Sequence, residues 1–147
     1  MSLKDNLQKD WIDAMKKKDR FKAGVISMAR AAILQEEKDN KKKLDDNDVI
    51  AVLSREVKQR REAIKEFEKG NRQDLVEQNK REIEILLDYL PQQLTEEEVS
   101  EIVKNAVNEV GAVNIKDMGK VMNAIMPNVK GKADGKMVSD LVKKNLQ

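Results

Sequence analysis

The sequence predicts an all-α protein in which residues 1–93 form a four-helix bundle and residues 94–147 form a smaller three-helix bundle. Apolar residues recur at helical spacing in seven successive segments, each bounded by capping residues, glycine or proline. Period-two alternation is absent, so we expect no β-strand. Charged residues make up 38% of the chain and aromatic residues 3%. That composition is typical of slender helices with solvated outer faces.

The first two helices have clear boundaries. Ser2 followed by Asp5 resembles a capping box, in which a hydroxyl accepts a hydrogen bond from a free amide at the start of a helix. The stripe of Leu7 and Trp11 follows it. Asp19 is expected to cap a second, longer helix, which ends at the lysine run 41–43.

The next two helices complete the first bundle. The acidic run 45–48 offers caps for the third helix, and Gly70 is a natural stop for it. Pro91 is expected to terminate the fourth helix, because the residue before a proline disfavours helical backbone. Short connections between four amphipathic helices favour an antiparallel bundle.

The second bundle begins at a strong capping box. Thr95 supplies the hydroxyl and Glu98 the carboxylate three residues later, which is the economical explanation for the glutamate run 96–98. The remaining boundaries are a stop at Gly111, a cap at Asn114 and Pro127, which we expect to end the middle helix. The last helix is expected to follow Asp134.

Composition excludes several classes of chemistry. The chain has no cysteine and no histidine, so disulfides, thiolate nucleophiles and the commonest general base are absent. No segment approaches the roughly 20 apolar residues of a membrane span, and the first residues lack a secretory apolar region. We therefore expect a cytoplasmic protein that requires no cofactor, has no catalytic or metal-ligating residues of its own and does not bind a membrane.

Glycine stands beside lysine three times in the last third of the chain. The pairs are Gly119-Lys120, Gly131-Lys132 and Gly135-Lys136, with Lys130 directly before the second. Glycine permits close approach of the backbone, and lysine supplies a flexible charge suited to phosphate. From residue 116 onward seven lysines are opposed by three aspartates, although the whole chain carries only +2. The alternative is that the glycines make turns and the lysines are solvated.

This glycine-lysine segment does not fit a nucleotide-hydrolysing phosphate loop. The Walker pattern requires four residues between the glycines, a hydroxyl residue after the lysine and a preceding strand. Here three residues separate Gly131 from Gly135, Met137 follows Lys136, and no strand is expected. A softer interpretation remains, in which Gly135 and Lys136 open a helix whose free amides hold a phosphate.

Three other features favour structural roles. The basic run 58–61 and Arg72 are interpreted as a solvated helix face, partly because Glu56 lies four residues before Arg60. The methionines at 118, 122 and 126 follow helical spacing and fit either core filling or a groove for a partner. Trp11 is interpreted as a packing anchor.

Four motifs together resemble the YqeY family, over nearly the whole chain. They are Arg72-Gln73-Asp74-Leu75, Tyr89-Leu90-Pro91-Gln92-Gln93-Leu94, Gly119-Lys120-Val121-Met122 and Gly131-Lys132-Ala133-Asp134-Gly135. Members of this family are stand-alone relatives of a tail region in the glutamine-dependent aspartyl/glutamyl-tRNA amidotransferase, where the tail follows the catalytic core that performs ATP-dependent activation. A similar module is appended to some glutaminyl-tRNA synthetases.

The resemblance implies two helical bundles and a surface that contacts tRNA. It also links the chain to carbon-nitrogen ligases that use glutamine as amido-N-donor. It does not imply that this chain is itself a catalyst. The resulting hypothesis is a non-catalytic tRNA-binding accessory module, with an amidotransferase or an aminoacyl-tRNA synthetase as a further partner. Its contact residues would be Gly119, Lys120, Lys130, Gly131, Lys132, Gly135 and Lys136. The alternatives are a helical protein-protein adaptor and an accessory component of a tRNA amidation assembly.

Overall fold

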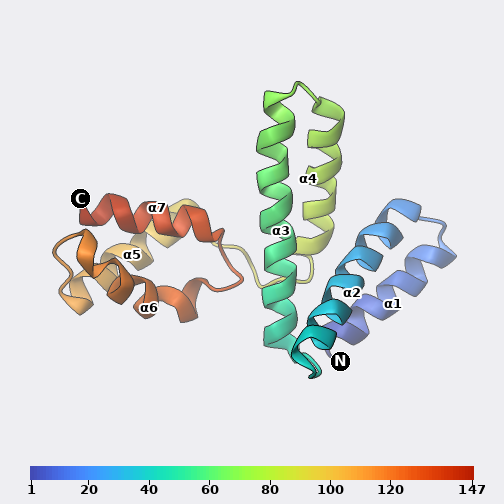
Figure 1. Ribbon diagram of the computed structural model, residues 1–147, viewed down its shortest axis with the longest axis horizontal. Helices are drawn as coiled ribbons and strands as arrows, with labels where there is room; N and C mark the ends of the chain where they lie inside the picture. The colour runs from blue at the N-terminus through green and yellow to red at the C-terminus, as the bar shows by residue number, and fades with distance from the viewer. The chain divides into compact units, whose positions relative to one another are not determined.

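The computed structural model describes residues 1–147 and confirms the all-α prediction (Figure 1). It contains seven α-helices, one short 3₁₀ turn and no β-strand. In chain order the elements are α1 (Leu3–Lys16), α2 (Arg20–Asn40), α3 (Asp46–Lys69), α4 (Gln73–Leu87), α5 (Glu96–Val110), η1 (Ile115–Asp117), α6 (Met118–Val129) and α7 (Gly135–Leu146). No helix has the length and apolar character needed to cross a bilayer.

Local capping explains where most helices begin. Full capping boxes are present at Ser2, Asp45 and Thr95, each with the acidic partner three residues later. Asp19 and Asp134 cap α2 and α7 with single side-chain hydrogen bonds. These predicted starts are confirmed because each cap satisfies amides that have no partner inside the helix.

Three predicted boundaries differ from the structure. The fourth helix ends at Leu87, before Pro91 is reached. Asp88 takes the C-cap position, and a turn follows it. Asn114 caps the 3₁₀ turn rather than α6 itself. Pro127 lies inside α6.

The position of Pro127 has a packing explanation. Its missing N–H would have bonded the carbonyl of Asn123, and Asn123 is an exposed residue. Two residues later Val129 is buried in the core, and the N–H of Lys130 donates to the carbonyl of Met126 at 3.0 Å. Burial of Val129 therefore keeps the helix going past the proline.

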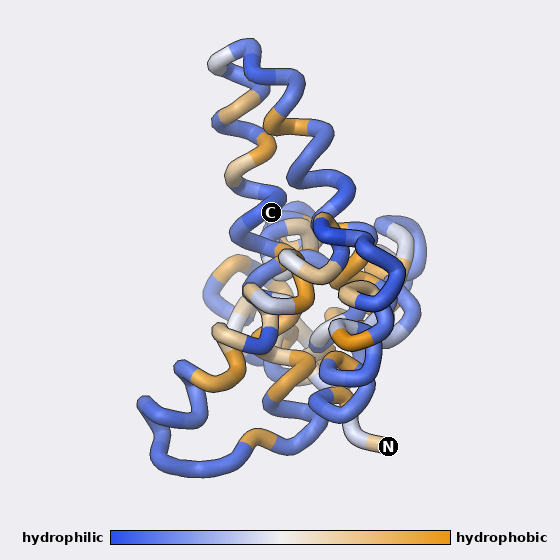
Figure 2. Tube along the Cα trace, turned by 90° about the vertical axis from the view of Figure 1, so that its right-hand side faces the viewer, coloured by the Kyte–Doolittle hydropathy of each residue, from blue (hydrophilic) through white to orange (hydrophobic).

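The first compact unit, Met1–Leu90, consists of two helical hairpins, α1–α2 and α3–α4. Their shared core is aliphatic and includes Leu7, Ile26, Leu53 and Leu86, all nearly inaccessible to solvent. Trp11 packs at its edge, as predicted. The end of the α3–α4 hairpin around Gly70 projects beyond α1–α2 and is mostly hydrophilic (Figures 1 and 2).

The second compact unit, Pro91–Gln147, packs α5, α6 and α7 around a separate aliphatic core. Val103, Val121 and Val142 are completely buried in it. The predicted domain boundary between residues 93 and 94 stays a prediction.

Candidate nucleic-acid interface

The predicted contact residues lie at the two opposite ends of α6. Gly119 and Lys120 are in its first turn, whereas residues 130–136 form the α6–α7 loop and the start of α7. Since α6 has 12 residues, about 18 Å separates its ends. The helices α6 and α7 pack against each other and run in opposite directions within this unit (Figure 1). The seven residues therefore form two groups rather than one site.

The α6–α7 loop is held by its backbone. The N–H of Lys132 donates to the carbonyl of Val129 at 2.9 Å, and the carbonyl of Lys132 accepts from the N–H of Leu94 at 2.7 Å. The carbonyl of Gly131 accepts from the amide Nε2 of Gln93 at 2.9 Å. The segment after the first unit thus fixes the loop without using any lysine side chain.

The lysine side chains of both groups are free of ion pairs. Lys120, Lys130 and Lys136 are exposed, and Lys132 is half-buried. None of the four forms a salt bridge. Asp117 is a nearby acid, and its pKa is lowered mainly by the N–H of Val113, then by the amide of Asn114 and the charge of Lys120. These lysines are available to an external anion.

The three glycines differ in whether the structure of the protein requires a glycine at their position. Gly131 has a φ of 74°, a left-handed conformation that favours glycine, so the turn explains it. Gly119 and Gly135 lie in the first turns of α6 and α7, and neither has a positive φ. A Cβ atom at either position would meet no atom within 4 Å. Neither turn geometry nor packing inside the molecule therefore requires glycine at Gly119 or Gly135.

The group at the start of α6 has further lysines around it. The 3₁₀ turn before α6 packs against α7, whose last turn carries Lys143 and Lys144. Lys116 lies in the 3₁₀ turn itself. Lysines from three elements, η1, α6 and α7, therefore lie at this end.

The methionine stripe is divided between core and surface. Met118 and Met122 pack against the core of this unit, whereas Met126 is 42% exposed. A continuous methionine groove is absent, because only one of the three side chains projects into solvent.

In the first unit, sequence reasoning missed a buried ionic cluster. The pattern around Arg60 predicts a solvated face, but its side chain is only 11% exposed. Its guanidinium lies 3.3 Å from a carboxylate oxygen of Glu56 and 3.3 Å from one of Glu82, which is itself buried. The partner on α4 lies 22 residues away, so no local pattern indicates this burial.

Arg72 behaves as predicted for a solvated residue. It forms a bidentate pair with the carboxylate of Asp74 at 3.1 and 3.0 Å, and both side chains are mainly exposed. The hydrogen bonds raise the pKa of Arg72 and lower the pKa of Asp74. The pair lies at the start of α4.

Tyr89, another motif residue, has a structural contact. Its hydroxyl donates to the carboxylate of Asp10 on α1 at 2.6 Å. Burial first, and this hydrogen bond second, raise the pKa of Tyr89 well above its usual value. The contact fastens the segment after α4 to α1.

The fold and its charges thus define an all-helical protein of two compact units, in which seven lysines and only three aspartates lie in the second half of the second unit, from residue 116 onward. Residues 4–146 match the family described as "Yqey-like protein", and the chain belongs to this family. A protein of Pyrenophora tritici-repentis named "Altered inheritance of mitochondria protein 41, mitochondrial" is 29% identical over 143 residues, covering 96% of this chain and 77% of its own. A protein of the same name from Lachancea thermotolerans is 37% identical over 112 residues, covering 74% and 60%.

A third relative, an uncharacterized protein of Schizosaccharomyces pombe, is 31% identical over 86 residues, covering 58% of this chain and 70% of its own. The expectation of a cytoplasmic protein is contradicted by the named relatives, whose names describe them as mitochondrial proteins. Composition could not reveal this, because the absence of cysteine does not separate one reducing compartment from another.

Proposed function

We propose that the unit Pro91–Gln147 binds the sugar-phosphate backbone of tRNA as a non-catalytic accessory module. The lysine group at the start of α6 and the lysine group of the α6–α7 loop contact different phosphates of the same folded RNA. Recognition by shape and charge, without reading of base sequence, is common for structured RNA. Family membership supports this proposal through the resemblance to the amidotransferase tail.

The observation that carries the proposal is the open space at Gly119 and Gly135. Alanine favours a helix over glycine, and nothing in the protein would clash with its methyl group at either position. Both glycines stand directly before an exposed lysine in a first turn, where amides point out of the helix. An external group that approaches the backbone closely accounts for both features.

Binding to total tRNA and to duplex DNA of equal charge tests the proposal. We expect the protein to prefer tRNA and to lose affinity steeply between about 50 and 200 mM salt, because bound lysines release counterions from phosphates. Absence of binding at the lower salt concentration would rule the proposal out. Equal binding to duplex DNA would show that this surface binds polyanions in general and does not select tRNA.

The glycines give an independent prediction. Gly119→Ala and Gly135→Ala should each raise the free energy of unfolding by about 0.4–1 kcal/mol while weakening tRNA binding. Gly24→Ala is the matched control, since Gly24 is exposed inside α2 and also has no atom within 4 Å of a new Cβ. It should stabilise the protein and leave tRNA binding unchanged. If all three variants bind tRNA equally well, the hypothesis that the RNA approaches the backbone closely at Gly119 and Gly135 is wrong.

A protein-protein adaptor is the second candidate function, favoured by exposed apolar side chains. Val113 is 80% exposed and Ile115 is 47% exposed, both in the α5–α6 connection. A partner that stays bound after nuclease treatment and at high salt would support this function.

A role in a tRNA amidation assembly requires amidation activity that appears only when a separate amidase subunit is supplied.

A further inference from the structure

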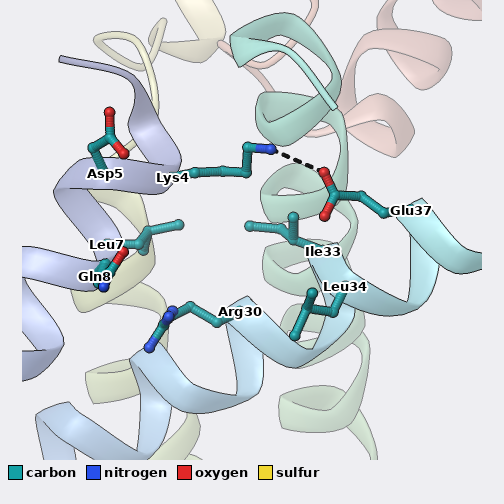
Figure 3. Close-up of a pocket in the computed structure, with 8 residues that line it drawn as sticks. All are labelled: Lys4, Asp5, Leu7, Gln8, Arg30, Ile33, Leu34 and Glu37. Carbon is teal, nitrogen blue, oxygen red and sulfur yellow. Dashed lines mark hydrogen bonds and ion pairs between the residues drawn. The ribbon is translucent and has the colours of Figure 1, made fainter. Parts of the chain in front are cut away.

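A pocket of about 180 Å³ lies between α1 and α2 of the first unit and contains none of the lysines of the tRNA proposal (Figure 3). Its two ends are polar and its middle is aliphatic. The lining residues are Lys4, Asp5, Leu7, Gln8, Arg30, Ile33, Leu34 and Glu37.

The aliphatic part belongs to the core of the first unit. Leu7 and Ile33 are buried and extend toward each other across the middle of the pocket (Figure 3). Leu34 lies at the edge and is 56% exposed. A short hydrocarbon chain placed here would cover the apolar surface of Leu34 and stay in contact with the core.

The acidic groups of the pocket already have partners. Glu37 Oε2 lies 2.9 Å from Lys4 Nζ and accepts from the N–H of Leu44 at 2.8 Å. The hydrogen bond from Lys4, followed by that from Leu44, lowers the pKa of Glu37, so this carboxylate stays charged and paired. Asp5 belongs to the capping box of α1 and accepts from the N–H of Ser2 at 3.4 Å.

Arg30, at the opposite end of the pocket from the Lys4–Glu37 pair, has no such partner. Its side chain is half-buried, and no carboxylate forms an ion pair with it. The guanidinium lies over the ring of Trp11, 5.5 Å from its centroid, which restrains its position. Gln8 lines the same end (Figure 3). A half-buried guanidinium retains donors that match a carboxylate in a bidentate arrangement.

We propose that this pocket binds a small aliphatic monocarboxylate. The carboxylate pairs with Arg30 beside the Gln8 amide, and the hydrocarbon chain packs on Leu7, Ile33 and Leu34. The four charged lining residues carry two positive and two negative charges, which disfavours a doubly charged phosphate. The volume is below the usual range of about 300–1,000 Å³ for pockets that hold larger ligands, so a small acid fits better.

Titration of the full chain with isovalerate, followed by NMR of its methyl groups, tests the proposal. We expect saturable shifts of the methyl signals of Leu7, Ile33 and Leu34. Isovaleramide, which has the same shape without the charge, and inorganic phosphate should not produce them. Arg30→Gln should weaken isovalerate binding about tenfold or more, because it removes a charge-assisted hydrogen-bonded pair.

Arg81→Gln is the matched control, since Arg81 also lies over an aromatic ring, that of Phe21 at 4.1 Å, but outside the pocket. It should bind isovalerate as the unchanged protein does. Circular dichroism of each variant reports whether folding is intact, and an Arg30→Met variant, which also removes the charge, replaces Arg30→Gln if the latter unfolds. The proposal is overturned if isovalerate causes no saturable shift, if the amide or phosphate competes equally, or if binding is independent of Arg30.

Discussion

A double charge reversal, Lys132→Glu with Lys136→Glu, is expected to lower the affinity for tRNA by about tenfold to a hundredfold near 50 mM salt. The slope of log affinity against log salt concentration should flatten by about two, because each lysine that neutralises a phosphate contributes about one. The loop itself should persist, since Lys132 is held by its backbone N–H and carbonyl. Fluorescence anisotropy with labelled tRNA at several salt concentrations measures both quantities.

A control variant with the same change in net charge distinguishes the loss of direct lysine–phosphate contacts from the effect of the protein's net charge. Lys58→Glu with Lys104→Glu reverses two exposed lysines that form no salt bridge and lie outside both lysine groups. This variant should lose only a small part of the affinity and keep the original salt slope. Equal losses in the two double variants would show that net charge, and not the α6–α7 loop, governs binding.

The helices were predictable because their signals are local. Ser2, Asp45 and Thr95 each precede an acidic residue by three positions, and a capping box requires only that spacing and the apolar stripe behind it. Pro127 shows the limit of local signals. A proline normally ends a helix, but the burial of Val129 in the three-helix core outweighs that preference.

The sequence analysis identified the residues of the candidate site but missed how they are arranged. Sequence alone identified the glycine-lysine pairs, and it grouped them because they are close along the chain. An antiparallel connection through residues 130–134 places Gly119 and Gly135 at opposite ends of α6. A short connection between two helices already indicates that arrangement, so the signal was present in the sequence.

The pocket and the buried ionic cluster had no sequence signal. Arg30 and Trp11 are on different helices, and so are Arg60 and Glu82. Glu56 and Arg60 are spaced as an ordinary exposed pair would be. Only the packing of α3 on α4, which brings Glu82 beside the guanidinium, distinguishes a buried cluster from a solvated one.

Arg60→Ala is therefore expected to destabilise the protein by about 3–5 kcal/mol, because it leaves two carboxylates poorly solvated without their cation. The side chains of Arg60, Glu56 and Glu82 are only 11%, 15% and 8% exposed. Glu82 would keep a single weak hydrogen bond, from the amide of Gln78 at 3.4 Å. Urea unfolding followed by circular dichroism measures the change in the free energy of unfolding.

Arg72→Ala is the comparison that gives this result its meaning. Arg72 makes the better bidentate geometry with Asp74, yet both side chains are more than half exposed. Water replaces the lost contacts there, so the urea midpoint should hardly move. If the cost at Arg60 comes from stranded buried charge, replacing the pair with apolar residues, as in Arg60→Met with Glu82→Leu, should recover much of the loss. An Arg60→Ala variant that unfolds at the same urea concentration as Arg72→Ala would show that water reaches this cluster in the folded protein.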